Sequence, residues 1–328
     1  MWDYWDLILC GSFLLVLLWL RRRYCQSSRH GWLKPDGRFV LITGCDTGFG
    51  HALAKRLDER GCNVFATCLL EQGEGAKELR RTGTARMRVI PLDVSSDESV
   101  QACLRRVREA EAVGQTGLWA VVNNAGINLL ADVEFCTMDM YKRVAEVNLF
   151  GMIRVCKAFL ALIRESKGII VNVTSIKGLI SDYHSSAYVV TKYGGEGFSD
   201  ALRVEMKRFG VTVCLVEPGN FGVSTGMMNK DIHKKNYDKQ WEEAPDDIKQ
   251  LYGYDYLEKK LEHTVSVTAN PSIEPVLDAM EAALFHPDPE VRYVIPGGDG
   301  LLDKYTVFAT LKHYLPYKMM DYLVEKYC

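Results

Sequence analysis

A tyrosine and a lysine stand four residues apart in the stretch YVVTK, at Tyr188 and Lys192. On a helix, residues at i and i+4 share a face, so the ammonium group would lie beside the phenol. A tyrosine with a pKa of about 10 is a poor base at neutral pH, but an adjacent cation favours the phenolate and lowers that pKa. We therefore predict that Tyr188 takes a proton from a substrate hydroxyl while hydride leaves the same carbon.

Two further polar residues are placed to assist this chemistry. Ser175 ends the apolar run VNVTS and could hold the substrate oxygen, and Asn148 in EVNLFG could order a water through which the proton escapes. Alone, a Y-x-x-x-K pair is more often a surface pair, and a serine at a strand end is more often a cap. Here the pair and the serine occur together with further motifs, and each of these lies at the end of an element that faces the same crevice.

The turn TGCDTGFG, Thr43 to Gly50, directly follows an apolar run and has glycines at Gly44, Gly48 and Gly50. A strand, a glycine-rich turn and a helix bring unpaired backbone N–H groups and the positive helix end together, which attracts a pyrophosphate. The spacing G-x-x-x-G-x-G is a weak indication alone, because glycines also serve packing. The other strand ends strengthen it.

Three later strand ends carry residues suited to binding a cofactor. Asp93 ends a strand in PLDV, where a carboxylate could meet an adenine ring. Asn123 to Gly126, NNAG, are small enough for the backbone to approach a cofactor closely. The sequence EPG, Glu217 to Gly219, ends the last central strand. Since ligands of open α/β sheets bind beyond the carboxyl ends of the strands, these residues predict a dinucleotide site.

Apolar runs and helical windows alternate along the chain. The predicted strands are 39–43, 63–67, 87–92, 118–122, 169–174, 211–217 and 292–296. The predicted helices are 51–60, 97–112, 138–165 with a break near Gly151, and 188–209. Most of the strand runs lack polar alternation, as in strands buried on both faces of a sheet. The pattern predicts an α/β fold of Rossmann type, a doubly wound, mostly parallel seven-stranded sheet.

Residues 38–328 are expected to form a single dinucleotide-binding catalytic domain. Within it, residues 220–270 are rich in Lys, Asp, Glu and Tyr, and are predicted to be an insertion that covers the mouth of the sheet. A solvated helical excursion without a role is the alternative. Residues 301–328 are dense in Tyr, Leu and Met, and either lie on a membrane surface or form an ordinary amphipathic packing helix.

The first 23 residues are predicted to be a membrane-anchor helix, followed by a linker over residues 24–37. Residues 7–20 are apolar or small, and three arginines follow. Fourteen helical residues span about 21 Å against a hydrocarbon core of roughly 30 Å, so flanking aromatic residues would have to extend the span. The alternative is a buried or docked N-terminal helix. The arginines would place the rest of the chain in the cytosol.

Composition excludes other classes of partner. The formal net charge of -2 gives no general attraction to nucleic acid. Ten cysteines lack any C-x-x-C pair and are expected to be buried free thiols in a reducing compartment. No His/Cys cluster predicts a metal site.

Residues from about 38 to 296 resemble the short-chain dehydrogenases/reductases, through T-G-x-x-x-G-x-G, N-N-A-G, the asparagine, the serine, Y-x-x-x-K and P-G. TGCDTGFG, GLWAVVNNAG, EVNLFG and VEPGNF are similar to the branch of D-3-hydroxybutyrate, retinol and 17β- or 11β-hydroxysteroid dehydrogenases. The resemblance implies an NAD(P)-dependent enzyme that interconverts a secondary or allylic alcohol and its carbonyl. A catalytically silent dinucleotide-binding scaffold is the alternative from another class.

Within the branch, a 3-hydroxybutyrate dehydrogenase-like activity is predicted, and a retinol or hydroxysteroid dehydrogenase is the alternative. DVEFCTMDMYKRVAEVNLFG and EPGNF favour the hydroxybutyrate member, whereas the N-terminal segment favours the retinoid and steroid members. The resemblance implies an endoplasmic-reticulum membrane with a cytosolic catalytic domain, or alternatively a mitochondrial membrane. A homo-oligomer is a further possibility.

The resemblance also implies roles for individual residues. The catalytic ones are Asn148, Ser175, Tyr188 and Lys192. The cofactor would be bound by Gly44, Thr47, Gly48, Phe49, Gly50, Cys68, Asp93, Val94, Asn124, Ala125, Gly126, Tyr188, Lys192, Pro218 and Gly219. In this set Lys192 also holds the nicotinamide ribose. A threonine that binds the carboxamide is often found a few residues after the P-G, but here Val223 takes that position, with Ser224 and Thr225 beyond, so this contact stays open.

The second strand bears on the nucleotide. Counting along it, the position at which NAD-binding relatives carry an acid is Cys68, which departs from the pattern. No Arg or Lys stands at 68–70 or at 45–47 to neutralise a 2′-phosphate, and Asp46 and Glu71 would repel one. NAD is therefore predicted over NADP.

The substrate walls are expected after Ser175, just before Tyr188 and in the 220–270 insertion. For a carboxylate substrate, Lys177 is the obvious nearby cation. For a retinoid or steroid, an apolar tunnel would be lined by Phe221, Leu179, Ile180 and Met227. His184 could bind a polar substrate group, although we expect a solvated histidine.

Overall fold

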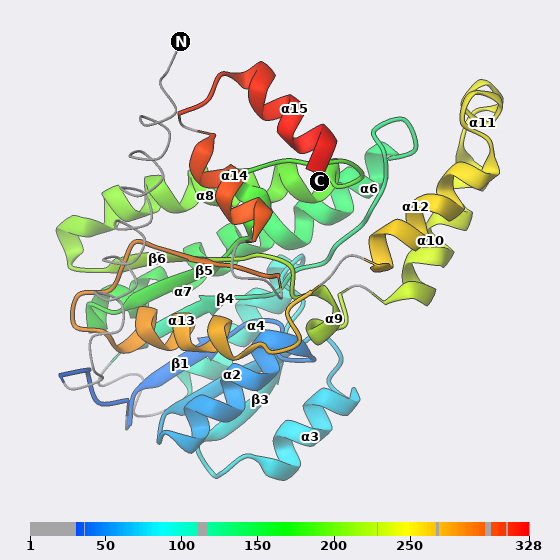
Figure 1. The fold of residues 1–328 in the computed structure, drawn as a ribbon. Coiled ribbons are helices and arrows are strands. Elements are labelled where there is room, and N and C mark those ends of the chain that lie inside the picture. Colours follow the sequence, from blue (N-terminus) through cyan, green and yellow to red (C-terminus); the bar gives the residue numbers. More distant parts are fainter. Residues whose placement is uncertain are drawn as a thin grey trace, which may run out of the picture.

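Seven parallel strands form one sheet in the order β3-β2-β1-β4-β5-β6-β7 (Figure 1). Their bounds are β1 Phe39–Ile42, β2 Asn63–Cys68, β3 Met87–Pro91, β4 Ala120–Asn123, β5 Ile169–Val173, β6 Thr212–Pro218 and β7 Arg292–Ile295. All seven predicted strands are confirmed, and every pairing is parallel. The chain runs outward from β1 to β3 and then returns to β4 on the other side of β1, so the switch point of the sheet lies between β1 and β4.

The computed structural model describes residues 31–35, 37–110, 117–227, 229–266, 269–298, 303–312 and 314–327. The predicted anchor, residues 1–23, and most of the predicted linker lie outside these ranges. Among the described residues, no helix combines the length and the apolar character that a membrane crossing needs.

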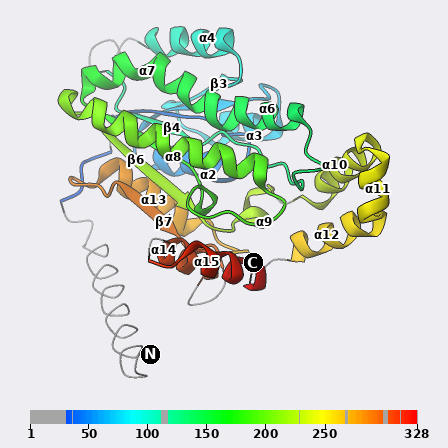
Figure 2. The ribbon, with the colours of Figure 1, turned by 90° about the horizontal axis from the view of Figure 1, so that it is seen from above.

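Two layers of helices cover the sheet (Figures 1 and 2). Alternate residues of a strand point to opposite faces, so Val40 and Ile42 of β1 pack on one face, and Phe39 and Leu41 on the other. The first face is covered by α2 (Gly48–Glu59), α3 (Glu74–Thr82) and α13 (Glu274–Phe285). The second is covered by α4 (Asp97–Arg108), α7 (Met152–Ser166) and α8 (Ser186–Met206), which a short 3-10 turn at Lys207–Phe209 follows.

The predicted helix 138–165 is built from three pieces. Helix α6 (Met138–Ala145) leads into a π-helical stretch, Glu146–Gly151, and then into α7. The expected break near Gly151 is therefore a local widening of a continuous helix. A side chain at Gly151 would lie 2.7 Å from a methyl group of Val94, so only glycine fits there. π-Helical stretches of this kind often occur at functional sites.

The insertion at 220–270 is helical. It consists of α9 (Gly222–Thr225), α10 (Lys230–Glu243), α11 (Asp246–Tyr252) and α12 (Tyr254–Ser266), and the last three project from the body of the molecule (Figure 1). Leu130 and Phe135 of the loop after β4 join the apolar cluster under these helices. These helices could not be predicted individually from the sequence, because they are short and mostly polar.

The C-terminal segment forms α14 (Lys304–Leu311) and α15 (Tyr317–Tyr327). Phe308 and Met320 pack against Ile176 and Ile180, next to the 3-10 turn Ile176–Gly178 that follows β5. Leu179 joins the same cluster, and neither it nor Ile180 lines the cavity described below, so the prediction of both as tunnel walls is wrong.

The described cysteines agree with the expectation of buried thiols. They are Cys45, Cys62, Cys68, Cys103, Cys136, Cys156 and Cys214, all free and buried. No group of His, Cys, Asp or Glu side chains suited to a metal ion occurs in the part of the chain that the structure describes.

Candidate active site

A cavity of about 810 Å³ lies at the carboxyl ends of the strands. Most of the predicted site residues line it: Gly44, Thr47, Gly48, Phe49, Asp93, Val94, Asn124, Ala125, Gly126, Ser175, Lys177, His184, Tyr188, Lys192, Pro218, Gly219 and Phe221. Gly50, Cys68 and Asn148 do not line it. The parallel topology therefore brings the strand ends together, as the alternation of strands and helices in the sequence predicted.

The glycine-rich turn is held from the loop after β4. The Asn124 Nδ2 donates hydrogen bonds to the carbonyls of Thr43 (2.9 Å) and Gly44 (3.1 Å). A Cβ on Gly50 would lie 2.4 Å from the Gly44 carbonyl oxygen. Gly50 is thus needed for the close approach of α2 to the turn. Helix α2 begins beyond Thr47, whose side chain caps no N–H group, which leaves its positive end to the cavity.

Asp46 fastens the same turn to β2. Its carboxylate accepts hydrogen bonds from the backbone N–H groups of Leu69 (2.9 Å) and Leu70 (3.0 Å). Both leucines line the cavity, whereas the Cys68 side chain is fully buried in the apolar cluster on the α2 side of the sheet. The structure thus corrects the assignment of Cys68 to the cofactor site: the last residue of β2 points into the core, and the carboxylate next to the end of β2 is that of the turn residue Asp46.

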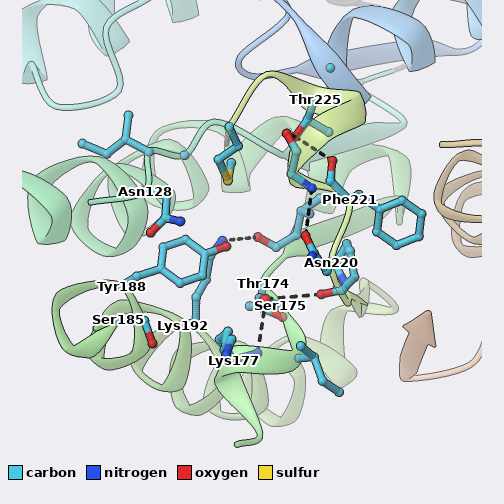
Figure 3. Close-up of a pocket in the computed structure, with 18 of the residues that line it drawn as sticks. Asn128, Thr174, Ser175, Lys177, Ser185, Tyr188, Lys192, Asn220, Phe221 and Thr225 are labelled. Carbon is cyan, nitrogen blue, oxygen red and sulfur yellow. Dashed lines mark hydrogen bonds between the residues drawn. The ribbon is translucent and has the colours of Figure 1, made fainter. Parts of the chain in front are cut away.

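Tyr188, Lys192 and Ser175 meet inside the cavity (Figure 3). The Lys192 Nζ lies 5.2 Å from the centre of the Tyr188 ring and donates to the Val173 carbonyl at 3.1 Å. Ser175 lies within hydrogen-bonding reach of the Tyr188 hydroxyl, and its own hydroxyl donates to the Pro218 carbonyl at 3.2 Å. A phenol, an ammonium and a hydroxyl therefore converge beside the glycine-rich turn.

Asn148 supports these residues from behind. Its side chain, buried in the π-helical stretch, accepts from the Ile127 N–H (2.8 Å) and donates to the Ile127 carbonyl (2.9 Å) and to Thr191 Oγ1 (3.2 Å). Thr191 stands between Tyr188 and Lys192 on α8. Asn148 thus joins the loop after β4 to the helix that carries both residues, and acts here as a positioning residue.

Comparison with known proteins agrees with this geometry. The family model described as short chain dehydrogenase matches residues 38–236. The chain belongs to the short-chain dehydrogenase family. It is 42% identical over 83% of its length to D-beta-hydroxybutyrate dehydrogenase, mitochondrial, of Bos taurus, and 80% of that protein is covered. It is 38% identical over 97% of its length to estradiol 17-beta-dehydrogenase 2 of Mus musculus, with 82% of that protein covered.

The fold agrees with solved structures as well. A short-chain dehydrogenase from Streptomyces avermitilis superposes with a TM-score of 0.67 at 23% identity, over 88% of this chain and 96% of that one. By its similarity to these relatives, the protein is an oxidoreductase of the hydroxybutyrate, retinol and hydroxysteroid dehydrogenase branch.

Burial controls the protonation of the central pair in this short-chain dehydrogenase. It raises the pKa of Tyr188 to about 12, and the hydrogen bond with Ser175 offsets part of that rise. It also lowers the pKa of Lys192 to about 8, against the opposing charge of Glu196. The shift of the Tyr188 pKa is opposite to the predicted lowering by Lys192, because the loss of hydration on burial is its largest cause.

The substrate end of the cavity differs from expectation at two residues. Lys177 forms an ion pair with Asp182, which also accepts a hydrogen bond from the Tyr305 hydroxyl of α14 (3.0 Å). The cation that could have held a substrate carboxylate is therefore already neutralised. The side chain of His184 is only 8% exposed and pairs with Asp132, so the expectation of a solvated histidine is wrong.

The cofactor end has two further departures. Phe221 is 2% exposed and packs against Phe49 with ring centres 5.7 Å apart, so most of its ring belongs to the core. Thr225 lines the cavity next to Gly48, while Val223 is exposed and does not line it. Thr225 is therefore the threonine of this segment that lines the cavity, two residues later than the position that the resemblance implies.

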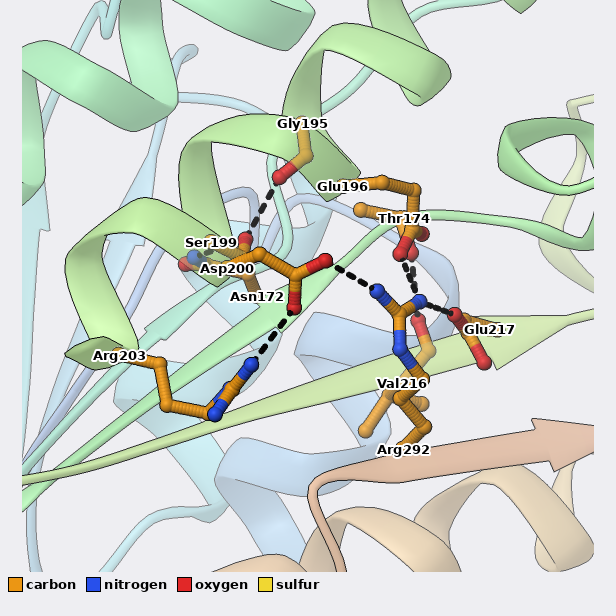
Figure 4. Close-up of polar contacts among 10 residues, drawn as sticks. All are labelled: Asn172, Thr174, Gly195, Glu196, Ser199, Asp200, Arg203, Val216, Glu217 and Arg292. Carbon is orange, nitrogen blue, oxygen red and sulfur yellow. Dashed lines mark hydrogen bonds and ion pairs between the residues drawn. The ribbon is translucent and has the colours of Figure 1, made fainter.

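Arg292 and three carboxylates from α8 and β6 form a cluster of ion pairs (Figure 4). Arg292 of β7 forms ion pairs with Glu217 of β6 (2.6 Å), with Asp200 of α8 (2.8 Å) and with Glu196, one turn after Lys192. Burial and the charge of Glu196 raise the pKa of Glu217, although Arg292 opposes the shift. This cluster could not be predicted from the sequence, because its members come from three separate elements.

Proposed function

We propose that the protein is an NAD-dependent dehydrogenase that interconverts a secondary or allylic alcohol and its carbonyl. The observation that carries the proposal is the meeting of Tyr188, Ser175 and Lys192 in the cavity that also contains the glycine-rich turn. A catalytically silent scaffold would have no need for a buried phenol and a buried ammonium in one site, since burial of both costs folding free energy.

The cavity fits a nicotinamide dinucleotide. The N-terminal end of α2 at Gly48 and Phe49 would receive the pyrophosphate, Asp93 and Val94 would meet the adenine, and Lys192 would hold the nicotinamide ribose. When bound, the oxidised cofactor accepts the hydride from the alcohol carbon. Asp46, in the turn after β1, favours NAD because its carboxylate would repel a 2′-phosphate near Leu69 and Leu70.

The protein's own residues would handle the proton. The Ser175 hydroxyl orients the alcohol oxygen, and Tyr188 removes its proton as the hydride leaves. Lys192 would stabilise the phenolate that Tyr188 becomes when it gives up its proton. The positive charge of an oxidised nicotinamide ring would also lower the pKa of Tyr188, against the effect of burial. Asn148 keeps the loop after β4 and α8 in register, so that these groups face the same oxygen.

A lipophilic alcohol of retinoid or steroid type is the substrate class that we favour. Because Lys177 is paired with Asp182, it offers no unneutralised charge to a carboxylate. Ile127, Leu130, Ile176 and Met227 are among the apolar residues that line the cavity. A 3-hydroxy acid is the second candidate, favoured by the 42% identity to a D-beta-hydroxybutyrate dehydrogenase and by Lys260 at the cavity wall.

We also propose that residues 1–23 anchor the enzyme in the endoplasmic-reticulum membrane, with a mitochondrial membrane as the alternative. The apolar run 7–20 with its three following arginines supports an anchor. Exposed Tyr314, Tyr317 and Tyr322 beside and on α15 would suit contact with the same membrane surface.

Replacement of Tyr188 by phenylalanine tests the mechanism. We expect kcat to fall by about 10²–10⁴ while NADH binding, followed by fluorescence, survives. Tyr193→Phe is the matched control, because its hydroxyl lies on the same helix but accepts from Lys312 and does not line the cavity. Substantial activity in Tyr188→Phe would contradict the mechanism.

The substrates offered should be 3-hydroxybutyrate, all-trans-retinol and an androgen, side by side with NAD and then with NADP. Turnover of retinol or the androgen supports the favoured class, and turnover of 3-hydroxybutyrate alone supports the second candidate. NADH binding without turnover of a broad set of alcohols would favour the scaffold.

A further inference from the structure

Asp182 stands at the centre of a polar cluster in the wall of the cavity. Its carboxylate forms an ion pair with the ammonium of Lys177, and it accepts hydrogen bonds from the hydroxyls of Ser185 (2.6 Å) and Tyr305 (3.0 Å). All four residues line the cavity, and the side chains of Asp182 and Lys177 are 14% and 18% exposed. The cluster therefore belongs to the wall that a substrate meets, although the proposed proton transfer does not use it.

Lys177 carries its charge close to the serine of the site. Its backbone N–H donates to Ser175 Oγ at 3.2 Å (Figure 3), so its side chain begins next to the hydroxyl that would orient the substrate oxygen. A lysine side chain is a point charge on a flexible stem and suits a carboxylate held near that hydroxyl. The ammonium is instead paired with Asp182 and lies over the ring of Tyr305, 4.2 Å from the ring centre. Two groups of the protein thus hold the charge that a substrate carboxylate would need.

The chain around Asp182 keeps its carboxylate in this position. His184 has a φ of 59°, in the left-handed region, so the chain turns sharply just after Asp182. Ser185 precedes α8, but its side chain caps no N–H group of the helix and donates to Asp182 instead. Tyr305 reaches the same carboxylate from α14. Asp182 is therefore held from the start of α8 and from α14, and its charge stays beside Lys177.

This arrangement acts against a negatively charged substrate in two ways. Because the Lys177 charge is compensated, a substrate carboxylate gains little by approaching it. The same carboxylate would also meet the negative charge of Asp182, and like charges brought together in a partly buried site repel each other strongly. A neutral alcohol meets neither effect. Binding sites often obtain specificity in this way, through a group that penalises the wrong ligand.

We propose that Asp182 is a specificity-determining residue, which disfavours anionic alcohols by retaining the ammonium of Lys177. The inference rests on the proposed dehydrogenase function and deepens it, because it assigns the choice between a neutral alcohol and a hydroxy acid to one side chain. Removal of the Asp182 charge should release Lys177 toward the cavity and admit a carboxylate beside Ser175.

Asp182→Asn in the full chain tests the proposal, with butyrate and its neutral isostere butyramide as probes. The amide is the same size as the carboxylate and can still bond to both hydroxyls, since a hydroxyl accepts as well as donates, but it leaves Lys177 uncompensated. With NADH present, we expect the ratio of butyrate affinity to butyramide affinity to rise by at least about tenfold over wild type. Asp182→Ser, a second variant without the charge, should show a gain in the same direction. A merely structural role of Asp182 would not produce a gain for one charge class.

Two double variants identify the cation. Asp182→Asn combined with Lys177→Met should lose the gained affinity for butyrate, because the ammonium is gone. Asp182→Asn combined with Lys260→Met should keep it. Lys260 lines the same cavity, but its ammonium lies over the rings of Tyr183 and Tyr256, 5.4 Å from each centre. Loss of the gain with Lys260→Met, and not with Lys177→Met, would overturn the assignment.

Tyr305→Phe is the matched control for disturbance of the cluster. It removes one hydrogen bond to Asp182 and leaves both charges of the ion pair in place. The ratio of butyrate affinity to butyramide affinity should stay at the wild-type value. A rise equal to that in Asp182→Asn would mean that loosening of the wall, and not its charge, admits the anion, and would overturn the proposal.

Turnover separates this inference from the proposed function. With NAD, we expect the ratio of kcat/KM for 3-hydroxybutyrate to that for 3-hydroxybutyramide to rise with the binding ratio in Asp182→Asn. A gain in butyrate binding without turnover of any alcohol would support the role of Asp182 and count against the dehydrogenase. Turnover of retinol with an unchanged binding ratio in both Asp182 variants would overturn the role of Asp182 and leave the dehydrogenase intact.

Discussion

Asp46 binds the backbone of Leu69: its carboxylate accepts the Leu69 N–H at 2.9 Å, and so joins the glycine-rich turn after β1 to the end of β2. Leu70 donates to the second oxygen at 3.0 Å. In the proposed site this acid would face the adenine ribose of the dinucleotide, although it comes from the turn and not from β2. The same residue therefore fixes the turn and brings negative charge to the nucleotide site.

Replacement of Asp46 by asparagine should relax the preference for NAD. The amide keeps one oxygen for the Leu69 N–H but loses the charge that would oppose a 2′-phosphate. We expect the ratio of kcat/KM for NADP to that for NAD to rise by about tenfold, equivalent to about 1.4 kcal/mol. Steady-state kinetics with both cofactors measure it.

Glu71→Gln is the matched control for that change. It removes a negative charge close by in the sequence, but Glu71 does not line the cavity. The ratio should move less than about twofold, as expected for an exposed charge. An equal effect of the two variants, or none in Asp46→Asn, would contradict the assignment of Asp46.

Gly50→Ala should weaken cofactor binding. The new Cβ would lie 2.4 Å from the Gly44 carbonyl oxygen and 2.5 Å from Asn124 Nδ2, so the turn must shift. Overpacking costs about 1–3 kcal/mol, which exceeds the gain of up to about 1 kcal/mol from a better helix former. We expect a lower Tm and at least about tenfold weaker NADH binding.

Gly197→Ala is the matched control for Gly50→Ala, because a new Cβ at Gly197 would meet no other atom closely. Gly197 lies inside α8, and a Cβ there would meet nothing within 4 Å. Gly197→Ala should raise stability by about 0.5–1 kcal/mol and leave NADH binding unchanged. If Gly50→Ala behaved like Gly197→Ala in thermal unfolding and NADH titration, the close approach of α2 to the turn would not matter for the site.

The central strands could be predicted because burial on both faces makes β1, β4 and β5 continuous or nearly continuous apolar runs. The predicted ends agree with the observed ones within two residues, and the parallel topology then gathers the residues at those ends. That is why Ser175, Tyr188 and Gly44 could be assigned to one crevice. The agreement depends on a local pattern and on a rule of chain topology.

The failures concern side-chain direction and distant partners. Cys68 was misassigned because counting along β2 cannot tell which face its last residue takes. The burial of Lys177 and His184 depends on Asp182 and Asp132, which lie on loops whose course the sequence does not define. The π-helical stretch around Asn148 likewise depends on tertiary packing, since its residues also suit an ordinary helix.

Glu196→Gln should shift the pH dependence of the reaction. Burial lowers the pKa of Lys192 to about 8, and the charge of Glu196 is what opposes that shift. Without this charge the pKa of Lys192 falls further, and its ammonium is lost at lower pH. We expect the alkaline limb of kcat/KM for NAD, which reports the free enzyme, to move down by roughly one pH unit or less.

Asp200→Asn separates this effect from the loss of an arginine contact. Asp200 and Glu196 both pair with Arg292, but only Glu196 acts on Lys192. The alkaline limb should therefore stay in place in Asp200→Asn, although both variants disturb the cluster behind α8. Equal shifts in the two variants would mean that Arg292, and not the charge of Glu196, controls Lys192.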